Sequence, residues 1–130
     1  MPKTSLVSVV EDDRYFRDSM KRLMRSQGYS VETFSSAADF LASPRYVETA
    51  CLIADVHMPE MTGIELYRRL IETGYMIPTI LITAYPNDAD RDRALMDGIV
   101  CYLGKPVDDK HLMRCLRAAL QSSEPSEENS

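Results

Sequence analysis

The sequence predicts an α/β protein built on one parallel β-sheet with helices covering both faces. Short apolar runs alternate along the chain with segments whose apolar residues recur at helical spacing, and about five such strand–helix units follow one another. Most of the runs are largely apolar, as expected for strands that are buried on both sides. Four of them lead into a polar or charged residue, and the carboxyl ends of parallel strands line one crevice.

Five segments are predicted strands. They span residues 6–10, 29–34, 51–54, 79–82 and 100–103. The second alternates polar and apolar residues, whereas the others are short apolar runs.

The segments that follow these strands are predicted helices, and they span residues 14–27, 37–41, 63–73, 87–96 and 108–121. Gly28, Gly74 and Gly98 supply stop signals, because glycine adopts the left-handed conformation that ends many helices. Ser36 and Asp108 are candidate N-caps. The fourth helix carries few apolar residues, so we expect it to be loosely packed or shifted.

The chain has 130 residues, which fits one domain at residues 1–121. The polar stretch 122–130 is predicted to be a disordered tail or the start of an inter-domain linker. No stretch approaches the roughly 20 apolar residues of a membrane span, and the first residues lack a signal-peptide core. We therefore expect a cytoplasmic protein that does not associate with a membrane.

Several classes of function find little support. The net charge is −5, and no basic run suggests contact with nucleic acid by this segment. The three cysteines are scattered and form no C-x-x-C pair, which argues against a zinc site or a disulfide framework. No glycine-rich phosphate loop follows the first strand, and His57 and His111 have no partner at metal-ligand spacing.

Acidic residues gather at the predicted edge of the sheet. Glu11 and Asp12 follow the first strand, and Asp55 follows the third. Each like-charge pair at ~5 Å costs roughly 3 kcal/mol at an effective dielectric constant of about 20, and Lys105 offsets only one charge. Either a carboxylate stays protonated or a cation binds, and Mg²⁺, which takes oxygen ligands, fits best. A simpler interpretation is that the acidic run only caps the following helix, and this role suits Asp13.

These residue types suit one reaction. Asp55 can attack phosphorus as a nucleophile and become an aspartyl phosphate. Mg²⁺ and Lys105 can neutralise charge on the transferring phosphoryl group. Thr83, after the fourth strand, can donate a hydrogen bond to a phosphoryl oxygen.

The chain resembles the receiver domains of response regulators in two-component signalling over residues 5–121. The resemblance rests on four motifs that stand in order along the chain: Val9-Val10-Glu11-Asp12-Asp13, the segment from Asp55 to Leu66, Thr83-Ala84 and Lys105-Pro106. It implies a flavodoxin-like (βα)5 doubly wound parallel sheet with strand order 2-1-3-4-5. It also implies a domain that is not an enzyme and that catalyses only its own phosphorylation and dephosphorylation.

The resemblance implies a role for each residue at the acidic cluster. Asp55 would be the phospho-acceptor. Asp12 and Asp55 would bind Mg²⁺ through their side chains, His57 through its main-chain carbonyl and Glu11 through a metal-bound water. His57 and Tyr85 also fall near the expected mouth of the site, where they would influence the access of water to an acyl phosphate.

The resemblance further implies a switch. Thr83 and Lys105 would contact the phosphoryl group, and the peptide before Pro106 would be cis. Tyr102 falls at the family's switch aromatic, although an aromatic residue on the last strand also suits the core. On phosphorylation Thr83 would move toward the phosphoryl group and Tyr102 would turn inward, which would remodel the face of the fourth helix, fifth strand and last helix.

Partners follow from the same resemblance. A sensor histidine kinase would donate the phosphoryl group. The remodelled face, expected to lie near Arg91, Arg93, Leu103 and Arg114, would bind a partner or a second copy in a homodimer. Because the chain resembles receivers that precede a helix-turn-helix domain, we expect it to belong to a DNA-binding transcriptional regulator; the alternative is a stand-alone receiver that relays phosphate or controls a protein partner.

Two other functions compete with this hypothesis. An aspartyl-phosphate phosphatase or phosphotransferase would need a general acid near the nucleophile, and His57 is a poor substitute for the second carboxylate of such enzymes. A receiver-like fold without phosphorylation would serve only in protein interaction. The complete acidic set, with Thr83 and Lys105, argues against that reading.

Overall fold

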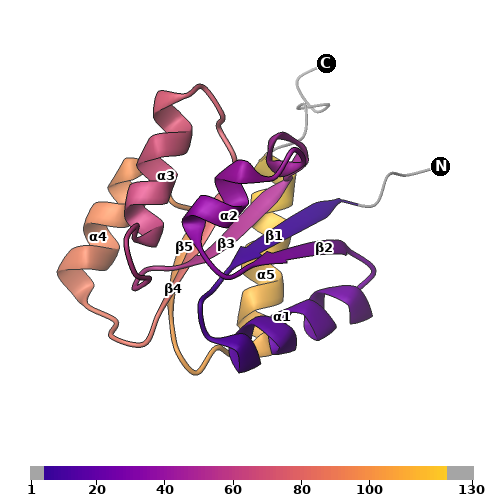
Figure 1. The fold of residues 1–130 in the computed structure, drawn as a ribbon. Coiled ribbons are helices and arrows are strands. Elements are labelled where there is room, and N and C mark those ends of the chain that lie inside the picture. Colours follow the sequence, from indigo (N-terminus) through magenta and orange to yellow (C-terminus); the bar gives the residue numbers. More distant parts are fainter. Residues whose placement is uncertain (1–4, 123–130) are drawn as a thin grey trace, which may run out of the picture.

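The computed structural model describes residues 5–122, within which five α-helices and five β-strands alternate along the chain (Figure 1). The strands form one parallel sheet in the order β2-β1-β3-β4-β5. The chain therefore starts near the middle of the sheet, moves to one edge and crosses back to the other. This is the doubly wound arrangement, with the strand order, that the resemblance to receiver domains implied.

All predicted helices and strands are present, and each boundary lies within one residue of its predicted position. The strands are β1 Leu6–Val10, β2 Ser30–Phe34, β3 Cys51–Asp55, β4 Thr79–Thr83 and β5 Cys101–Gly104. The helices are α1 Arg14–Ser26, α2 Ala37–Ala42, α3 Gly63–Glu72, α4 Asp88–Asp97 and α5 Asp109–Ser122. A short 3-10 helix, Tyr46–Glu48, was not predicted. The predicted tail at 122–130 lies outside the described residues except for Ser122, which ends α5.

Two apolar cores lie on opposite faces of the sheet. One packs α1 and α5 against the strands, and the other packs α2, α3 and α4 against them (Figure 1). Examples are Met24, Ile53 and Leu116 in the first core and Phe40, Leu52 and Leu66 in the second. Successive residues of a strand point to opposite faces, so a continuously apolar strand such as β3 contributes to both cores.

Among residues 5–122, no helix combines the length and the apolar character needed to cross a bilayer.

Helix α4 is fixed at its ends rather than along its length. Its one buried residue is Ala94, which agrees with the low apolar content of its sequence. At its start, the side chain of Asn87 accepts a hydrogen bond from the backbone of the first turn. At its end, the hydroxyl of Tyr67 in α3 donates to the carbonyl of Asp97 (3.1 Å), and Arg68 forms an ion pair with the Asp97 carboxylate (3.5 Å).

Two glycines with the same backbone conformation provide a test of the Tyr67 contact. Gly98 follows α4 with φ of 111°, and a Cβ there would lie 2.5 Å from the Tyr67 hydroxyl oxygen. Gly28 has φ of 91°, but a Cβ there would meet nothing within 4 Å. Both Gly→Ala changes carry a left-handed backbone cost of roughly 1–2 kcal/mol. We expect Gly98→Ala to lower the free energy of unfolding by a further ~1–3 kcal/mol in urea denaturation, because only this change forces a collision.

Replacing Tyr67 with Phe in the Gly98→Ala protein should recover part of that difference. Equal losses of stability for Gly28→Ala and Gly98→Ala would show that Tyr67 does not restrict this position.

Candidate functional site

The site residues lie where neighbouring parallel strands end. Asp55 and Thr83 are the last residues of β3 and β4 and are still paired in the parallel ladder. Glu11 directly follows β1, and Lys105 directly follows β5. The topology therefore places all four at the carboxyl edge of the sheet, as predicted.

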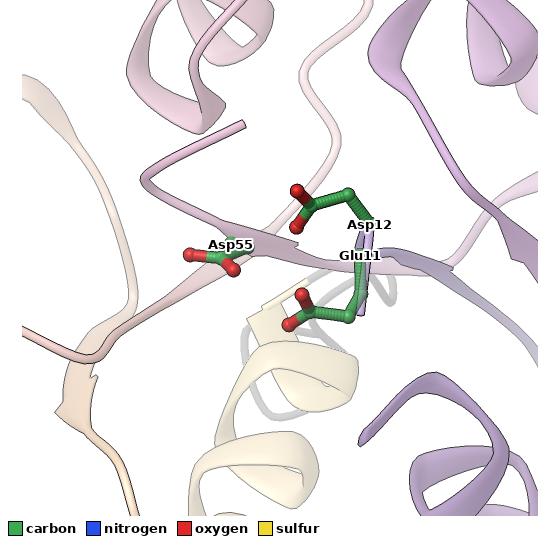
Figure 2. Close-up of side chains that lie close together, drawn as sticks. All are labelled: Glu11, Asp12 and Asp55. Atoms are coloured by element: carbon green, nitrogen blue, oxygen red, sulfur yellow. The ribbon is translucent and has the colours of Figure 1, made fainter. Parts of the chain in front are cut away.

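Three carboxylates converge at this edge. One oxygen of each of Glu11, Asp12 and Asp55 lies within 4.8 Å of the others. Figure 2 shows the side chains of Glu11 and Asp12 extending from the end of β1 toward the side on which Asp55 lies. Glu11 and Asp55 are buried, with 2% and 7% of their surface exposed, whereas Asp12 is exposed. The cluster thus has a buried floor and one carboxylate in contact with solvent.

Lys105 bridges two of these carboxylates. Its Nζ lies 3.0 Å from Oε1 of Glu11 and 3.2 Å from Oδ2 of Asp55. Partial burial opposes the charge of the ammonium group, but the hydrogen bonds and negative charges of Glu11 and Asp55 raise the pKa of Lys105 above its usual value. The peptide between Lys105 and Pro106 is cis, as expected.

One ammonium group does not balance the charge of three carboxylates. The excess negative charge contributes to a raised pKa of Glu11. Burial and the neighbouring Asp55 raise the pKa of Glu11 from 4.5 to about 7, although Lys105 and the N–H of Asp13, 3.0 Å from Oε2, act in the opposite direction. Only oxygen ligands are offered by the cluster, and they carry an excess of negative charge. The residues therefore fit a hard divalent cation.

The raised pKa of Glu11 makes the stability of the cation-free protein depend on pH. Between pH 4.5 and about 7 the folded protein holds a proton on Glu11 that the unfolded chain has released. The free energy of unfolding must therefore fall as the pH rises through this window. We expect a fall of about 3 kcal/mol or less from this group, measured by urea denaturation in EDTA at several pH values.

Two variants distinguish the contribution of Glu11 to this pH dependence from that of other groups. The fall should disappear in Glu11→Gln and persist in Asp12→Asn, because Asp12 is exposed. An unchanged pH dependence in Glu11→Gln would contradict the assignment.

Backbone groups orient Asp55 and Thr83. The N–H of His57 donates to Oδ1 of Asp55 (3.0 Å), and the N–H of Tyr85 donates to the buried hydroxyl oxygen of Thr83 (3.0 Å). The rings of His57 and Tyr85 meet edge to face, with centroids 5.5 Å apart, and Tyr85 is largely exposed. This pair lies beside the site at the solvent, while the use of the His57 carbonyl as a ligand stays a prediction.

Gly63 allows α3 to begin directly behind Asp55. A Cβ at Gly63 would lie 2.5 Å from the carbonyl oxygen of Asp55. Thr62 and Glu65 form a reciprocal capping box that fixes the first turn of α3 at this point. Residues of the motif that begins at Asp55 thus fix the start of α3 against the backbone of Asp55.

Helix α1 contributes two residues to which the sequence analysis gave no role in the site. The Nζ of Lys105 lies 4.4 Å from the centroid of the Phe16 ring, and Nη1 of Arg17 donates to the carbonyl of Glu11 (2.8 Å). Asp13 caps α1, which confirms its predicted role. The only signal for Phe16 and Arg17 was their place in the helical turn that follows the acidic pair.

Comparison with known proteins assigns the family. A model described as the response regulator receiver domain matches residues 7–117. The chain belongs to this family. The response regulator protein TodT of Pseudomonas putida is 37% identical over 119 residues, which are 92% of this chain and 52% of TodT. The transcriptional regulatory protein FixJ of Azorhizobium caulinodans is 32% identical over 123 residues, which are 95% of this chain and 58% of FixJ.

The structure of the response regulator StyR is also similar, with 36% identity and a TM-score of 0.85 over 93% of this chain and 61% of that one. This receiver domain therefore spans about half the length of the curated relatives it matches. Membership of the family confirms the resemblance and identifies a receiver of a two-component response regulator. It is not a conventional enzyme, and the phosphatase or phosphotransferase hypothesis is set aside.

Proposed function

We propose that this receiver domain accepts a phosphoryl group from a sensor histidine kinase onto Asp55. The proposal rests on one observation: Asp55 lies in a buried cluster with two further carboxylates and a fixed ammonium group. One oxygen of Asp55 contacts Lys105 and the other accepts the N–H of His57, so the carboxylate is held in a single orientation.

Mg²⁺ fits the donor set at Glu11, Asp12 and Asp55. In proteins this ion usually takes one or two carboxylates and keeps several waters. Asp12 and Asp55 would bind it directly, Glu11 through a water and His57 through its carbonyl. When bound, the ion would supply the positive charge that brings an anionic phosphodonor to an anionic acceptor.

The protein's own groups then perform the transfer. A carboxylate oxygen of Asp55 forms the new bond to phosphorus, and the bond from phosphorus to the donor breaks with its electron pair going to the donor. Lys105 stabilises the negative charge on the phosphoryl oxygens. Thr83, whose oxygen accepts the N–H of Tyr85, can direct its own hydroxyl hydrogen toward a phosphoryl oxygen.

Incubation with acetyl phosphate and Mg²⁺ tests this assignment by intact mass. We expect a gain of one phosphoryl group, which EDTA prevents and which Asp55→Ala lacks. Lys105→Ala should slow labelling roughly 100-fold, because a preorganised positive charge is lost. Asp13→Ala, which removes only a helix cap, should still be labelled; labelling that persists in Asp55→Ala would refute the proposal.

We further propose that phosphorylation changes the face formed by α4, β5 and α5. Burial raises the pKa of Tyr102, while a hydrogen bond from the backbone N–H of Asn87 lowers it. The phenol of Tyr102 therefore lies beside the N-cap of α4 and not deep in the core. Movement of Thr83 toward the phosphoryl group would let Tyr102 turn inward and release the start of α4.

The residues expected near this face are only partly exposed. Arg91, Arg93 and Arg114 are exposed, whereas Leu103, a residue of β5, is buried in the core between the sheet and α5. Alternation along β5 accounts for this burial, since Leu103 points away from the side on which Tyr102 packs. Because the three arginines are exposed, their side chains are available to contact a second copy or a protein partner.

The output of the switch is proposed to be transcription. FixJ is named a transcriptional regulatory protein, and the chain spans about half the length of such relatives. A DNA-binding output domain in a longer protein would account for both facts; a stand-alone receiver is the alternative. A cytoplasmic location stays the prediction made from the sequence.

Thr83→Ala tests the switch separately from phosphorylation. In the presence of Mg²⁺ and beryllofluoride, a phosphoryl analogue, the wild-type protein should show shifted backbone amide signals in α4 and β5. Thr83→Ala should bind the analogue but lose most of these shifts. Thr79→Ala is a matched control, because Thr79 is also buried but lies at the opposite end of β4. Full shifts in Thr83→Ala would remove Thr83 from the switch.

A further inference from the structure

We infer that the first turn of α1 positions the Lys105 ammonium group for phosphoryl transfer: Phe16 contacts Lys105, and Arg17 contacts its ion-pair partner Glu11. The inference rests on the proposed phosphorylation of Asp55 and adds two positioning residues to it. It starts from two contacts that adjacent residues of one helix make with the two members of one ion pair.

The contact of Phe16 with Lys105 is a cation–π interaction. The Nζ of Lys105 lies 4.4 Å from the ring centroid, well inside the ~6 Å over which a ring face attracts an ammonium group. Only 19% of the Lys105 side chain is exposed, so water weakens this attraction less than it would at the surface. The ring thus gives the ammonium group a third neighbour besides Glu11 and Asp55.

A ring is a suitable neighbour for a group that must change partners. The ammonium group has three N–H donors, and two face carboxylate oxygens at 3.0 and 3.2 Å. When a phosphoryl group is added to Asp55, an N–H must turn toward it. The ring face attracts the charge without requiring a particular N–H direction, so Phe16 can hold the position of Nζ while its hydrogen bonds rearrange.

Phe16 and Lys105 also border the same open space. Phe16, Lys105, Pro106 and Val107 line an open cavity of about 660 Å³ between α1 and the start of α5. Loss of the ring would enlarge this cavity and admit more water beside Lys105. Water would then compete with the phosphoryl oxygens for its N–H donors.

Arg17 fixes the other member of the ion pair. Its Nη1 donates to the carbonyl of Glu11 (2.8 Å), while Oε2 of Glu11 accepts the N–H of Asp13 (3.0 Å). Both the backbone and the carboxylate of Glu11 are therefore held by the beginning of α1. This leaves Oε1 facing Lys105.

A fluorinated phenylalanine series at position 16 isolates the electrostatic part of the Phe16 contact. Mono-, di- and trifluorophenylalanine change the size of the ring little but progressively weaken the negative potential of its face. We expect the rate constant for labelling by acetyl phosphate with Mg²⁺ to fall stepwise, to about two- to fivefold below the wild-type value. Phe16→Leu should show the full fall, and Phe16→Tyr should keep the wild-type rate.

Double variants test whether Phe16 and Arg17 act through Lys105. Phe16→Leu and Arg17→Gln should each slow the wild-type protein but have no further effect in Lys105→Ala. Arg14→Gln is the matched control for Arg17, because Arg14 is an exposed residue of the same helix whose ion pair with Asp18 lies at the surface. The Mg²⁺ affinity of Phe16→Leu should stay at the wild-type value, since a general disturbance of the cluster would weaken the ion and the rate together.

The results separate this inference from the proposed function. If the wild-type protein is not labelled on Asp55, the proposed function fails and the inference fails with it. If the wild-type protein is labelled but the fluorinated series shows one constant rate, Phe16 is not a positioning residue. Equal slowing by Phe16→Leu in the wild-type and Lys105→Ala proteins would likewise overturn the inference.

Discussion

The two ion pairs of Lys105 hold the functional edge of the sheet together. Lys105 follows β5, an outer strand, yet its ammonium group reaches past β4 to Asp55 at the end of β3 and to Glu11 beyond β1. Three strands are thereby connected through one side chain at the edge where the ligands would bind. The same group sets the charge of the site, because one positive charge opposes three carboxylates. Breaking either pair would leave a buried carboxylate without its neutralising partner, which is costly in a protein interior.

The incomplete charge balance is what suits this edge of the sheet to a cation. Burial and Asp55 together raise the pKa of Glu11 to about 7, so a divalent ion bound to the cluster would compete with a proton there. Repulsion among the carboxylates destabilises this edge of the folded protein. The two apolar cores on the two faces of the sheet offset that cost. Binding of a cation would recover part of it, because a ligand that binds only the folded state stabilises that state. The repulsion among the carboxylates and their affinity for a cation thus have the same origin.

Much of the fold, and the gathering of the acidic residues, follows from the sequence for a simple reason. Parallel strands end at one edge, so the residues after four apolar runs had to meet there. The predicted strands stopped at the last apolar residue, whereas the ladder continues one residue further to Asp55 and Thr83, because backbone pairing does not depend on side-chain polarity.

The contact of Phe16 with Lys105 could not be predicted in this way. Periodicity fixes which face of a helix is buried, but it does not give the distance from that helix to a loop 89 positions later.

A short chain of contacts connects Thr83, at the edge of the sheet where Asp55 lies, to α4. The hydroxyl oxygen of Thr83 accepts the N–H of Tyr85, and only Pro86 separates Tyr85 from Asn87, the N-cap of α4. Any displacement of the Thr83 hydroxyl must therefore either break this hydrogen bond or carry the loop with it. Helix α4 offers little resistance to such a change, because Ala94 is its one buried residue.

The far end of α4 is held more firmly, by the Tyr67 hydroxyl and the Arg68 ion pair at Asp97. The Asn87 cap lies within α4 and its own first turn, so movement of the start of α4 would leave its contacts with α3 intact. The polar sequence of α4, which contributes little to the core, is therefore compatible with a regulatory role. Because α4 buries little apolar surface, two positions of the helix would differ little in free energy, as the proposed switch requires.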